Sequence, residues 1–288
     1  MKKRFWKLPR HSLPFGERTL VMGVLNVTPD SFSDGGEFFT PARAFEHAGR
    51  MVADGADILD IGGESTRPGS AHVGAAEEIR RVMPVVEALA GRVAVPVSVD
   101  TTKARVARAA LAAGAEIVND ISGLRFDPAL ADEVARAGAG LVLMHSRGSR
   151  ETLHTLPPVA DIIAEVVESL GRSVAEALRR GVAREAIAID PGVGFGKSQE
   201  QNVELVAKLD ELARAFPDLP LLVGTSRKSF IGHLLGGAPA NQRVHGTMAS
   251  VAAAVLGGAS IVRVHDVRAA VETVRVADAI KKVHNTVA

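Results

Sequence analysis

The sequence contains no cysteine. That absence excludes disulfide bonds, thiolate nucleophiles and cysteine-based zinc sites, and it suits a reducing cytosol. Tyrosine is also absent and there is one tryptophan, so the sequence does not indicate an aromatic stacking platform for single-stranded nucleic acid. The net charge is only +1, which points neither to nucleic acid nor to an acidic membrane surface as a partner.

Long hydrophobic runs are missing as well. The N-terminus starts basic, but no apolar stretch of signal-peptide length follows it. The most apolar window, Val251 to Val264, contains Arg263 and is too short to span a bilayer. We therefore expect a soluble cytoplasmic protein without a membrane segment.

What the chain does contain is a recurring β/α pattern. A Gly-Ala pair, one further residue and an aliphatic run follow an Ala-rich amphipathic stretch at four places, namely Gly55–Ile61, Gly114–Val118, Gly138–Leu143 and Gly258–Val264. This pattern predicts a helix that ends at a left-handed glycine and leads into a buried strand. Near-continuous apolar strands alternating with helices are typical of a parallel sheet.

Eight such strands are predicted, and eight units favour an α/β fold of the (β/α)8 (TIM) barrel type as a single domain over residues 19–288. An open doubly wound sheet is the competing fold. Residues 1–18 precede the eight units, and we expect this extension to cover the bottom of the barrel. The predicted strands are Leu20–Asn26, Asp57–Gly62, Val95–Asp100, Glu116–Asp120, Gly140–His145, Ala186–Asp190, Leu221–Thr225 and Ser260–His265.

Two helix boundaries can also be predicted. Thr40-Pro41 is a plausible N-cap followed by proline at the first helical position, so the first helix is expected to begin there. A long helix is expected from about Val159 to Arg180, ending at Gly181.

Polar side chains stand at or just after the ends of the predicted strands. They include Asn26, Asp100, Asn119, His145, Asp190, Ser226, Lys228, Arg263 and His265. One such residue alone is most often a helix cap, a turn residue or a hydrogen-bonded structural histidine. Capping does not explain all the ends together, however, and in a barrel these ends meet at the face where active sites lie.

The residue types suggest a polar ring compound that carries a diphosphate. Asp100 and Asp190 are acceptors, Asn119 both donates and accepts, and Lys228 donates, which suits a flat heterocycle. Arg263, His265 and Asn26 suit an anion accompanied by a hard cation, because arginine grips phosphate oxygens and Mg²⁺ accepts a single amide oxygen beside waters and phosphates.

Two motifs fall short of known patterns. Gly192–Ser198 looks like a P-loop, but the spacing requires a glycine at Pro191, and the GxGxxG dinucleotide pattern also fails. A flexible loop close to a ligand is the favoured interpretation. No histidine pattern indicates zinc.

Several stretches resemble dihydropteroate synthases, pterin-binding TIM-barrel enzymes. Met22–Gly36 (MGVLNVTPDSFSDGG) and Asp60–Gly69 (DIGGESTRPG) resemble the two signature loops of that family. Five shorter matches follow in order: Ser98–Thr101, Asn119–Gly123, Asp190–Lys197, Gly224–Ser229 and Arg263–Val267. The resemblance covers nearly the whole chain, from about residue 19 to 282.

The resemblance implies an enzyme that joins a dihydropterin diphosphate to p-aminobenzoate and releases pyrophosphate in folate biosynthesis. The pterin would lie on Asp100, Asn119, Asp190 and Lys228, with Met144 and Phe195 as apolar walls. The diphosphate would meet Arg263 and His265, with Mg²⁺ on Asn26 and Thr66 nearby. The p-aminobenzoate carboxylate would lie near Ser226, in a pocket that includes Arg67, Phe32 and Pro68.

The same resemblance implies mobile loops at residues 27–39 and 63–72, sensitivity to sulfonamides, and a homodimer formed through the helices of units six to eight. Catalysis is expected from Asp100, Lys228, Arg263 and His265 without a covalent intermediate.

The chain departs from the family's usual pattern in two places. After His145 it reads Ser146–His154 instead of the usual Met-Arg-Gly run, which leaves the shape of that rim open. Asn241–Thr247 also differs, and there we expect Arg243 to make a helix-surface ion pair.

Three alternative functions stay open at this point. A corrinoid-dependent methyltransferase would share the pterin contacts but would not need Lys228 or the Arg-His pair. A Schiff-base aldolase would use Lys228 as its nucleophile. A non-catalytic pterin-binding homologue would be expected to have lost Asp100, Asn26 or Lys228, and all three are present.

Overall fold

The structure is a computed structural model that describes residues 4–27, 41–65, 72–149, 152 and 156–287. Its centre is a sheet of eight parallel strands in the order β8-β7-β6-β5-β4-β3-β10-β9. A bridge between Ile189 and Leu221 joins the two outer strands, so the sheet closes into a barrel. The strands are β3 (Leu20–Asn26), β4 (Ile58–Gly62), β5 (Val97–Asp100), β6 (Ile117–Asp120), β7 (Gly140–Met144), β8 (Ile187–Asp190), β9 (Leu222–Val223) and β10 (Ile261–Val264).

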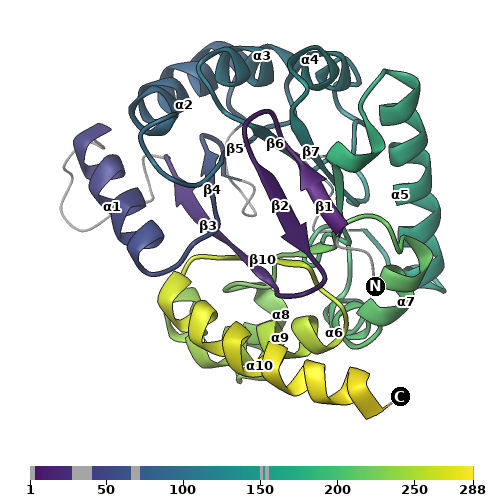
Figure 1. Ribbon diagram of the computed structural model, residues 1–288. Helices are drawn as coiled ribbons and strands as arrows, with labels where there is room; N and C mark the ends of the chain where they lie inside the picture. The colour runs from purple at the N-terminus through teal and green to yellow at the C-terminus, as the bar shows by residue number, and fades with distance from the viewer. Residues whose placement is uncertain (1–3, 28–40, 66–71, 150–151, 153–155, 288) are drawn as a thin grey trace.

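Helices surround the strands on the outside of the barrel (Figure 1). They are α1 (Pro41–Ala53), α2 (Ala75–Leu89), α3 (Ala104–Ala112), α4 (Leu130–Ala137), α5 (Ile162–Arg179), α6 (Gln199–Ala207), α7 (Leu209–Ala215), α8 (Ser229–Leu234), α9 (Val244–Leu256) and α10 (Val267–Val287), with short 3₁₀ turns at Arg184–Ala186 and Ala240–Gln242. No helix within the described ranges has the length and apolarity needed to cross a membrane.

The prediction of a TIM barrel is confirmed, and the open sheet is wrong. The glycines expected to end helices have left-handed backbones, with φ of 99°, 102°, 60° and 104° at Gly55, Gly114, Gly138 and Gly258. All eight predicted strands are found, most of them one or two residues shorter than expected. The largest difference is at Leu221–Thr225, where only Leu222–Val223 is extended, because the Thr225 carbonyl already accepts from Lys228 N–H in a turn.

The helix boundaries follow local capping chemistry. α1 begins at Pro41 as predicted, whereas Thr40 lies outside the described residues. α5 starts three residues later than Val159, because the Asp161 carboxylate accepts from the Ala164 N–H at 2.9 Å and forms the N-cap. It ends before Gly181, whose φ is 90°.

An N-terminal hairpin of β1 (Arg4–Lys7) and β2 (Ser12–Phe15) crosses the amino end of the barrel (Figure 1). Trp6 is fully buried, and its indole N–H donates to the Ala186 carbonyl at 2.7 Å. The side chains beneath it come from the inward-facing positions near the start of the strands: Leu20, Met22, Ile58, Ile117, Val142, Ala188, Leu222 and Ile261. The hairpin therefore fills this end of the barrel, while the boundary at residue 18 stays a prediction.

A buried carboxylate fastens the hairpin to the barrel. Glu116 lies just before β6 and is almost fully buried. It accepts from the Arg10 backbone N–H at 2.9 Å, from the Arg10 guanidinium at 3.0 Å and from His11 Nδ1 at 2.8 Å.

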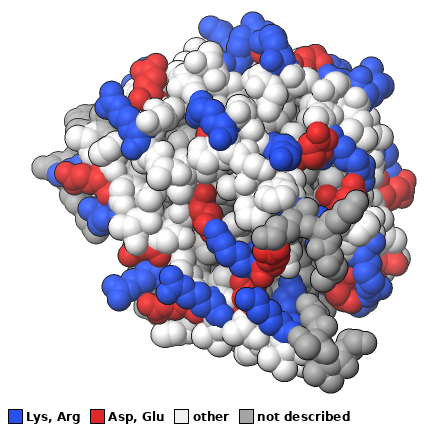
Figure 2. Space-filling view, in the orientation of Figure 1, with Lys and Arg blue, Asp and Glu red and all other residues white. Residues whose placement is uncertain are grey.

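Acidic and basic side chains are intermixed over the face of the molecule that carries the hairpin, without a large area of one sign (Figure 2).

Replacing Trp6 by alanine should destabilise the fold by about 3–5 kcal/mol, because the change empties the centre of this cluster and removes a buried hydrogen bond. Phe5→Ala is the matched control, since Phe5 is the neighbouring residue and its side chain is 38% exposed. This variant should lose about 1 kcal/mol of unfolding free energy or less. Urea unfolding followed by circular dichroism measures both losses. Tryptophan fluorescence cannot be used, because Trp6 is the one tryptophan in the sequence and is absent from the Trp6 variant. Equal losses in the two variants would contradict the packing role.

Candidate active site

The carboxyl ends of the strands place the predicted site residues at the end of the barrel opposite the hairpin. Neighbouring strands run in register across Asn26, Gly62, Asp100 and Asn119. Met144 and Asp190 form another registered pair in β7 and β8. Residues alternate along each strand, so the intervening side chains Leu25, Ile61, Val99, Val118, Leu143, Ile189 and Val264 belong to the outer core. The site residues therefore point into the barrel.

Arg263 links two carboxylates at the centre of this site. Its Nε–H donates to Asp60 Oδ2 at 2.7 Å, and its Nη2–H donates to Asp100 Oδ2 at 2.8 Å. Asp60 is fully buried, and the same oxygen also accepts from Asn119 Nδ2 at 2.9 Å. The predicted residues Asp100, Asn119 and Arg263 thus form one connected network.

The sequence analysis missed Asp60 as a site residue. In the sequence, Asp60 stands out only as the first residue of the motif Asp60–Gly69. The available signal was an acid inside the apolar strand Ile58–Gly62, at an inward position two residues before the strand end. Because an acidic side chain is rarely buried without a partner, that position indicates a cation inside the barrel.

Burial shifts the acid–base behaviour of the two ring-binding carboxylates. Burial raises the pKa of Asp100 to about 7 against the attraction of Arg263, and repulsion from Asp60, Glu78 and Asp120 adds to the rise. Burial also raises the pKa of Asp190 to about 6, although Asp190 accepts from the Gly192 N–H at 2.7 Å and is attracted by Lys228. Both groups can therefore exchange protons with a ligand near neutral pH.

Lys228 lies over the ring of Phe195, with Nζ 4.0 Å from the ring centre. Burial and the charge of Arg263 lower the Lys228 pKa to about 8, while Asp190 and Asp100 oppose the change. Phe195 packs with Met144 and with Ile121, a wall residue that the sequence analysis did not name. The site thus has one apolar wall beside a row of donors and acceptors.

Ser226 and His265 interact directly, although the sequence analysis assigned them to different subsites. Ser226 Oγ lies 2.9 Å from His265 Nδ1 and accepts from the His265 backbone N–H at 3.2 Å. Burial and the charges of Arg263 and Arg227 lower the His265 pKa to about 3, so the ring is neutral. When the Ser226 hydroxyl donates to Nδ1, the neutral ring carries its proton on Nε2, which then serves as a donor for a ligand.

The loop that carries Lys228 is held by its neighbours. Arg227 has φ of 59° and makes a two-point ion pair with Asp266 at 2.7 and 3.1 Å. Arg243 donates to the carbonyls of Ala238, Arg227 and Lys228 at 2.7, 2.8 and 3.2 Å. The expected surface ion pair of Arg243 is therefore replaced by contacts to backbone carbonyls, since its side chain reaches into the Lys228 turn.

The glycine-rich segment after β8 is built around Lys197, which is half-buried. Lys197 Nζ donates to the carbonyls of Gly192 and Phe195 at 2.8 and 3.0 Å, and to that of His145 at 3.4 Å. Gly192 has φ of 66°, and a Cβ there would lie 1.8 Å from the His145 carbonyl oxygen. Lys197 therefore stabilises a tight loop that presents Phe195. Gly192–Ser198 is thus a loop as expected, while its flexibility and its closeness to a ligand stay predictions.

The atypical segment after His145 is described in part. Ser146 is buried and accepts from Arg125 at 2.7 Å. Arg147 Nη1 donates to the carbonyls of Pro157 and Gly196 at 2.9 Å each, which ties this rim to the glycine loop. His145 is neutral, because burial and the charges of Lys197 and Arg125 lower its pKa to about 2.

Comparison with known proteins gives a consistent match over most of the chain. Residues 22–265 match the family of pterin binding enzymes. The dihydropteroate synthase of Synechocystis is 49% identical over 266 residues, which cover 92% of this chain and 91% of the relative.

Solved structures agree. A Xanthomonas albilineans dihydropteroate synthase with 4-aminobenzoic acid has a TM-score of 0.89 and 44% identity, covering 97% of this chain and 99% of that one. A Burkholderia cenocepacia dihydropteroate synthase complexed with 7,8-dihydropteroate has a TM-score of 0.87 and 42% identity, with 99% of each chain covered.

The chain belongs to the dihydropteroate synthase family.

Membership in the dihydropteroate synthase family confirms the predicted resemblance and decides against the methyltransferase and the aldolase. The geometry brings together ten predicted site residues, namely Asn26, Asp100, Asn119, Met144, Asp190, Phe195, Ser226, Lys228, Arg263 and His265. Thr66, Arg67, Phe32 and Pro68 lie outside the described residues, as do most of the loops 27–39 and 63–72.

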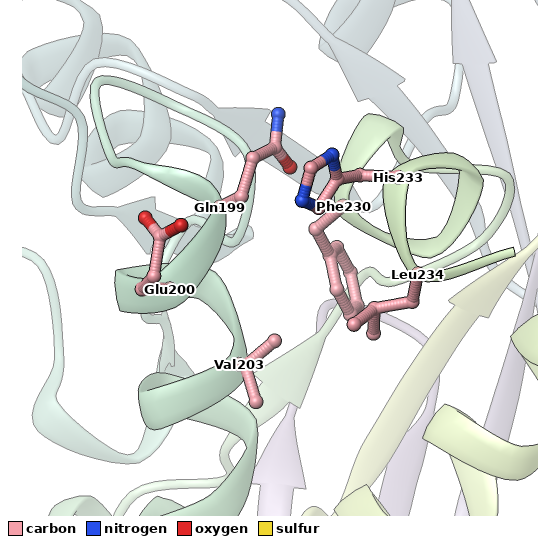
Figure 3. A pocket seen from close by; sticks show the side chains of 6 residues that line it. All are labelled: Gln199, Glu200, Val203, Phe230, His233 and Leu234. Carbon is pink, nitrogen blue, oxygen red and sulfur yellow. The ribbon is translucent and has the colours of Figure 1, made fainter. Parts of the chain in front are cut away.

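A surface pocket lies on the outside of the barrel. It is lined by Gln199, Glu200 and Val203 of α6 and by Phe230, His233 and Leu234 of α8 (Figure 3). Its lining includes none of the residues of the registered site at the strand ends. The chemistry of the family is therefore assigned to the barrel end and not to this surface pocket.

Asp100→Asn should stabilise the protein at high pH. Because the carboxyl has a pKa of about 7 when folded and an ordinary value of 3.8, the folded state binds its proton more tightly, and stability falls as pH rises through that window. The amide removes this loss, so its thermal midpoint should exceed that of the wild type at about pH 8 and approach it towards about pH 4. Thermal unfolding across this range tests the sign, and a pH-independent difference would contradict it.

Proposed function

We propose that this protein joins 6-hydroxymethyl-7,8-dihydropterin diphosphate to p-aminobenzoate and releases 7,8-dihydropteroate and pyrophosphate. The observation that carries the proposal is the registered row of Asp100 and Asn119, faced by Asp190 and Lys228 and adjoined by Arg263 and His265. These side chains offer hydrogen-bond acceptors and donors for a heterocyclic ring next to side chains that suit an anion, and all of them lie at the same end of the barrel. Folate biosynthesis is the pathway that the proposed product implies.

The pterin end of the substrate would occupy the walled part of the site. Phe195, Met144 and Ile121 offer an apolar face for a flat ring. Asp190 and Asp100 would accept from ring N–H and amino groups, and Lys228 would donate to a carbonyl or ring nitrogen. In their ionised form the two carboxylates would stabilise the positive charge that develops on the ring as the diphosphate departs.

The diphosphate end would lie next to Arg263 and His265. Arg263 uses Nε and Nη2 on carboxylates, so its Nη1 hydrogens remain for phosphate oxygens. His265 would donate from Nε2–H without bringing a full charge. These donors would stabilise the negative charge that grows on the leaving group.

We also propose a Mg²⁺ site at Asn26. Gly62 has no side chain, and a Cβ there would lie 3.5 Å from Asn26 Oδ1 and 3.8 Å from Asp100 Oδ2. The glycine therefore keeps open a space that two oxygen donors border, which fits a hard cation that takes its remaining ligands from water and phosphate. When bound, Mg²⁺ would supply positive charge to the departing pyrophosphate.

The chemical step needs no protein nucleophile. The bond between the pterin methylene carbon and the diphosphate oxygen breaks, and its electron pair leaves with pyrophosphate. The amine nitrogen of p-aminobenzoate forms the new C–N bond with its lone pair and then loses a proton. The residues of the barrel act by holding both reactants in line, an effect on the order of 7–11 kcal/mol in well-oriented reactions.

The acceptor pocket is proposed next to Ser226. The family resemblance implies that the carboxylate of p-aminobenzoate lies at this position, with further contacts to Arg67, Phe32 and Pro68, which are outside the described residues. Sulfonamides resemble that acceptor and are proposed to compete with it, raising the KM for p-aminobenzoate without changing kcat.

A homodimer through the last helices of the chain is proposed as well. Val276, Ile280 and Val283 form an exposed apolar stripe on α10, at 62%, 46% and 66% exposure. Leu256 of α9 and Leu234 of α8 are also exposed, and the three helices lie on the same side of the barrel (Figure 1). A self-complementary apolar face of this kind supports a two-fold dimer. The lack of cysteine supports a cytoplasmic location.

Turnover should depend on Lys228. Lys228→Ala removes the ammonium proposed to lie beside the pterin, so kcat/KM should fall by about 100-fold or more. Lys208→Ala is the control, because that lysine pairs with Glu204 on the helix surface. Pyrophosphate release with both substrates present measures the effect. Release by the Lys228 variant at the wild-type rate would reject the assignment, and no release by the wild type would reject the function.

Asn26→Ala should raise the Mg²⁺ concentration needed for half-maximal turnover by about tenfold, because one oxygen ligand is lost. Asn202→Ala is the control, since the Asn202 side chain hydrogen-bonds to Gly194 and Ser198 near the loop after β8 and not to Asn26 among the described residues. Rates at increasing Mg²⁺ after chelation measure the change. An unaltered Mg²⁺ requirement would move the cation away from Asn26.

Ile280→Glu should shift the protein from dimer to monomer, because it buries an unpaired charge in the proposed apolar interface. Leu178→Glu, on α5, is the control with a similarly exposed apolar side chain. Analytical ultracentrifugation distinguishes a 30.2 kDa monomer from twice that mass. A wild-type monomer at micromolar concentration would contradict the dimer.

A further inference from the structure

Asp60 lies directly beneath the site and is fully buried. Its Oδ2 accepts from both Asn119 Nδ2 and Arg263 Nε, at 2.9 and 2.7 Å. No ligand-binding role has been needed for Asp60 so far, yet it contacts two residues assigned to substrate. It is therefore placed to control how those residues meet the ligand.

The first consequence concerns the Asn119 amide. A carboxylate only accepts hydrogen bonds, so the atom of Asn119 that faces Asp60 must be the NH₂ group. The carbonyl oxygen Oδ1 is then the atom left for a ligand. Asn119 consequently offers an acceptor to the pocket, and the ligand group opposite must be a donor such as a ring N–H or an amine.

The second consequence concerns the guanidinium of Arg263. Because Nε is held by Asp60 and Nη2 by Asp100, the plane of the group is fixed at two points. The same carboxylate oxygen thus orients a ring-binding amide and an anion-binding arginine. This couples the two halves of the substrate site through one buried atom.

Stability alone does not account for a carboxylate here. Asp60 Oδ1 is buried and has no hydrogen-bond partner among the described residues, as is also the case for Ser98 Oγ, whose Cα pairs with that of Asp60 in the neighbouring strand. An unpartnered buried polar atom costs about 1–3 kcal/mol, and apolar side chains often replace buried ion pairs without loss. A residue kept in spite of this cost is expected to serve the site.

We propose that Asp60 is a positioning residue that sets the hydrogen-bond polarity of the pterin pocket, turning Asn119 into an acceptor and fixing Arg263 beside the diphosphate. The inference rests on the proposed function. Asp60 itself touches neither substrate and acts through Asn119 and Arg263.

A double-mutant cycle tests the coupling. Asp60→Ala and Asn119→Ala should each weaken binding of 6-hydroxymethyl-7,8-dihydropterin diphosphate by about tenfold or more. Since Asp60 acts largely through Asn119, the double variant should bind much better than the product of the two losses predicts. Calorimetric titration without p-aminobenzoate measures binding alone.

The matched control is Asp57→Ala. Asp57 precedes β4 at the other end of the barrel and, like Asp60, accepts from an arginine and from an N–H group, here Arg18 at 2.6 and 2.8 Å and Val21 N–H at 2.9 Å. This variant should leave the pterin affinity unchanged whatever it does to stability. Asp60→Leu replaces Asp60→Ala in the cycle if circular dichroism shows that the alanine variant does not fold.

Asp60→Asn separates orientation from charge. Arg263 Nε only donates, so it should hold the new amide with its oxygen in the place of Oδ2, and pterin affinity should stay within about threefold of the wild type. The variant lacks the negative charge of Asp60, however. In the wild type that charge, together with those of Glu78 and Asp120, raises the Asp100 pKa, whereas Arg263 lowers it. The acid limb of the kcat/KM profile should therefore move to lower pH, which a purely structural role would not produce.

Wild-type affinity in folded Asp60→Ala or Asp60→Leu protein, multiplicative losses in the cycle, or an unmoved acid limb in Asp60→Asn would each overturn the inference. These results leave the proposed function standing if the wild type binds the pterin and releases pyrophosphate. A wild type that does neither would instead reject the proposed function itself.

Discussion

The parallel register of β3, β4, β5 and β6 is the constraint on which the site depends. It aligns Asn26, Gly62, Asp100 and Asn119 across four neighbouring strands, at the same height in the barrel. Because side chains alternate along a strand, a shift of one residue in any pair would turn its polar residue into the apolar core between sheet and helices. The outward neighbours are all apolar and buried, which makes such a shift costly.

The site also concentrates charged side chains in a poorly hydrated environment. Asp60, Asp100, Asp190, Lys228 and Arg263 gather within a barrel whose interior is otherwise closed by the Trp6 cluster. Burial moves the pKa values of Asp100, Asp190 and Lys228 towards neutrality and keeps His265 uncharged. Active sites commonly hold groups in such unfavourable environments, and the remaining core supplies the stability that this requires.

The supporting contacts come largely from backbone groups. Lys197 and Arg243 both direct cationic side chains at carbonyl oxygens and thereby shape the loops that carry Phe195 and Lys228. These two loops have no sheet partners to define them, so the half-buried cations take over that role here. A sequence motif shows such a lysine or arginine without showing that its target is the backbone, which is why the expected ion pair of Arg243 was wrong.

Local sequence patterns were sufficient to predict the helix ends and the strands of this protein. Glycines after amphipathic stretches set the helix ends, and apolar runs set the eight strands with their polar last residues, because these depend on neighbours a few positions away. Other contacts appear only in the closed barrel: Asp60 meets Arg263 across 203 residues, Ser226 contacts His265, and Trp6 closes the opposite end. Such pairings and the pKa values that follow from burial depend on barrel closure, which brings distant residues together and removes water, and no local pattern records either effect.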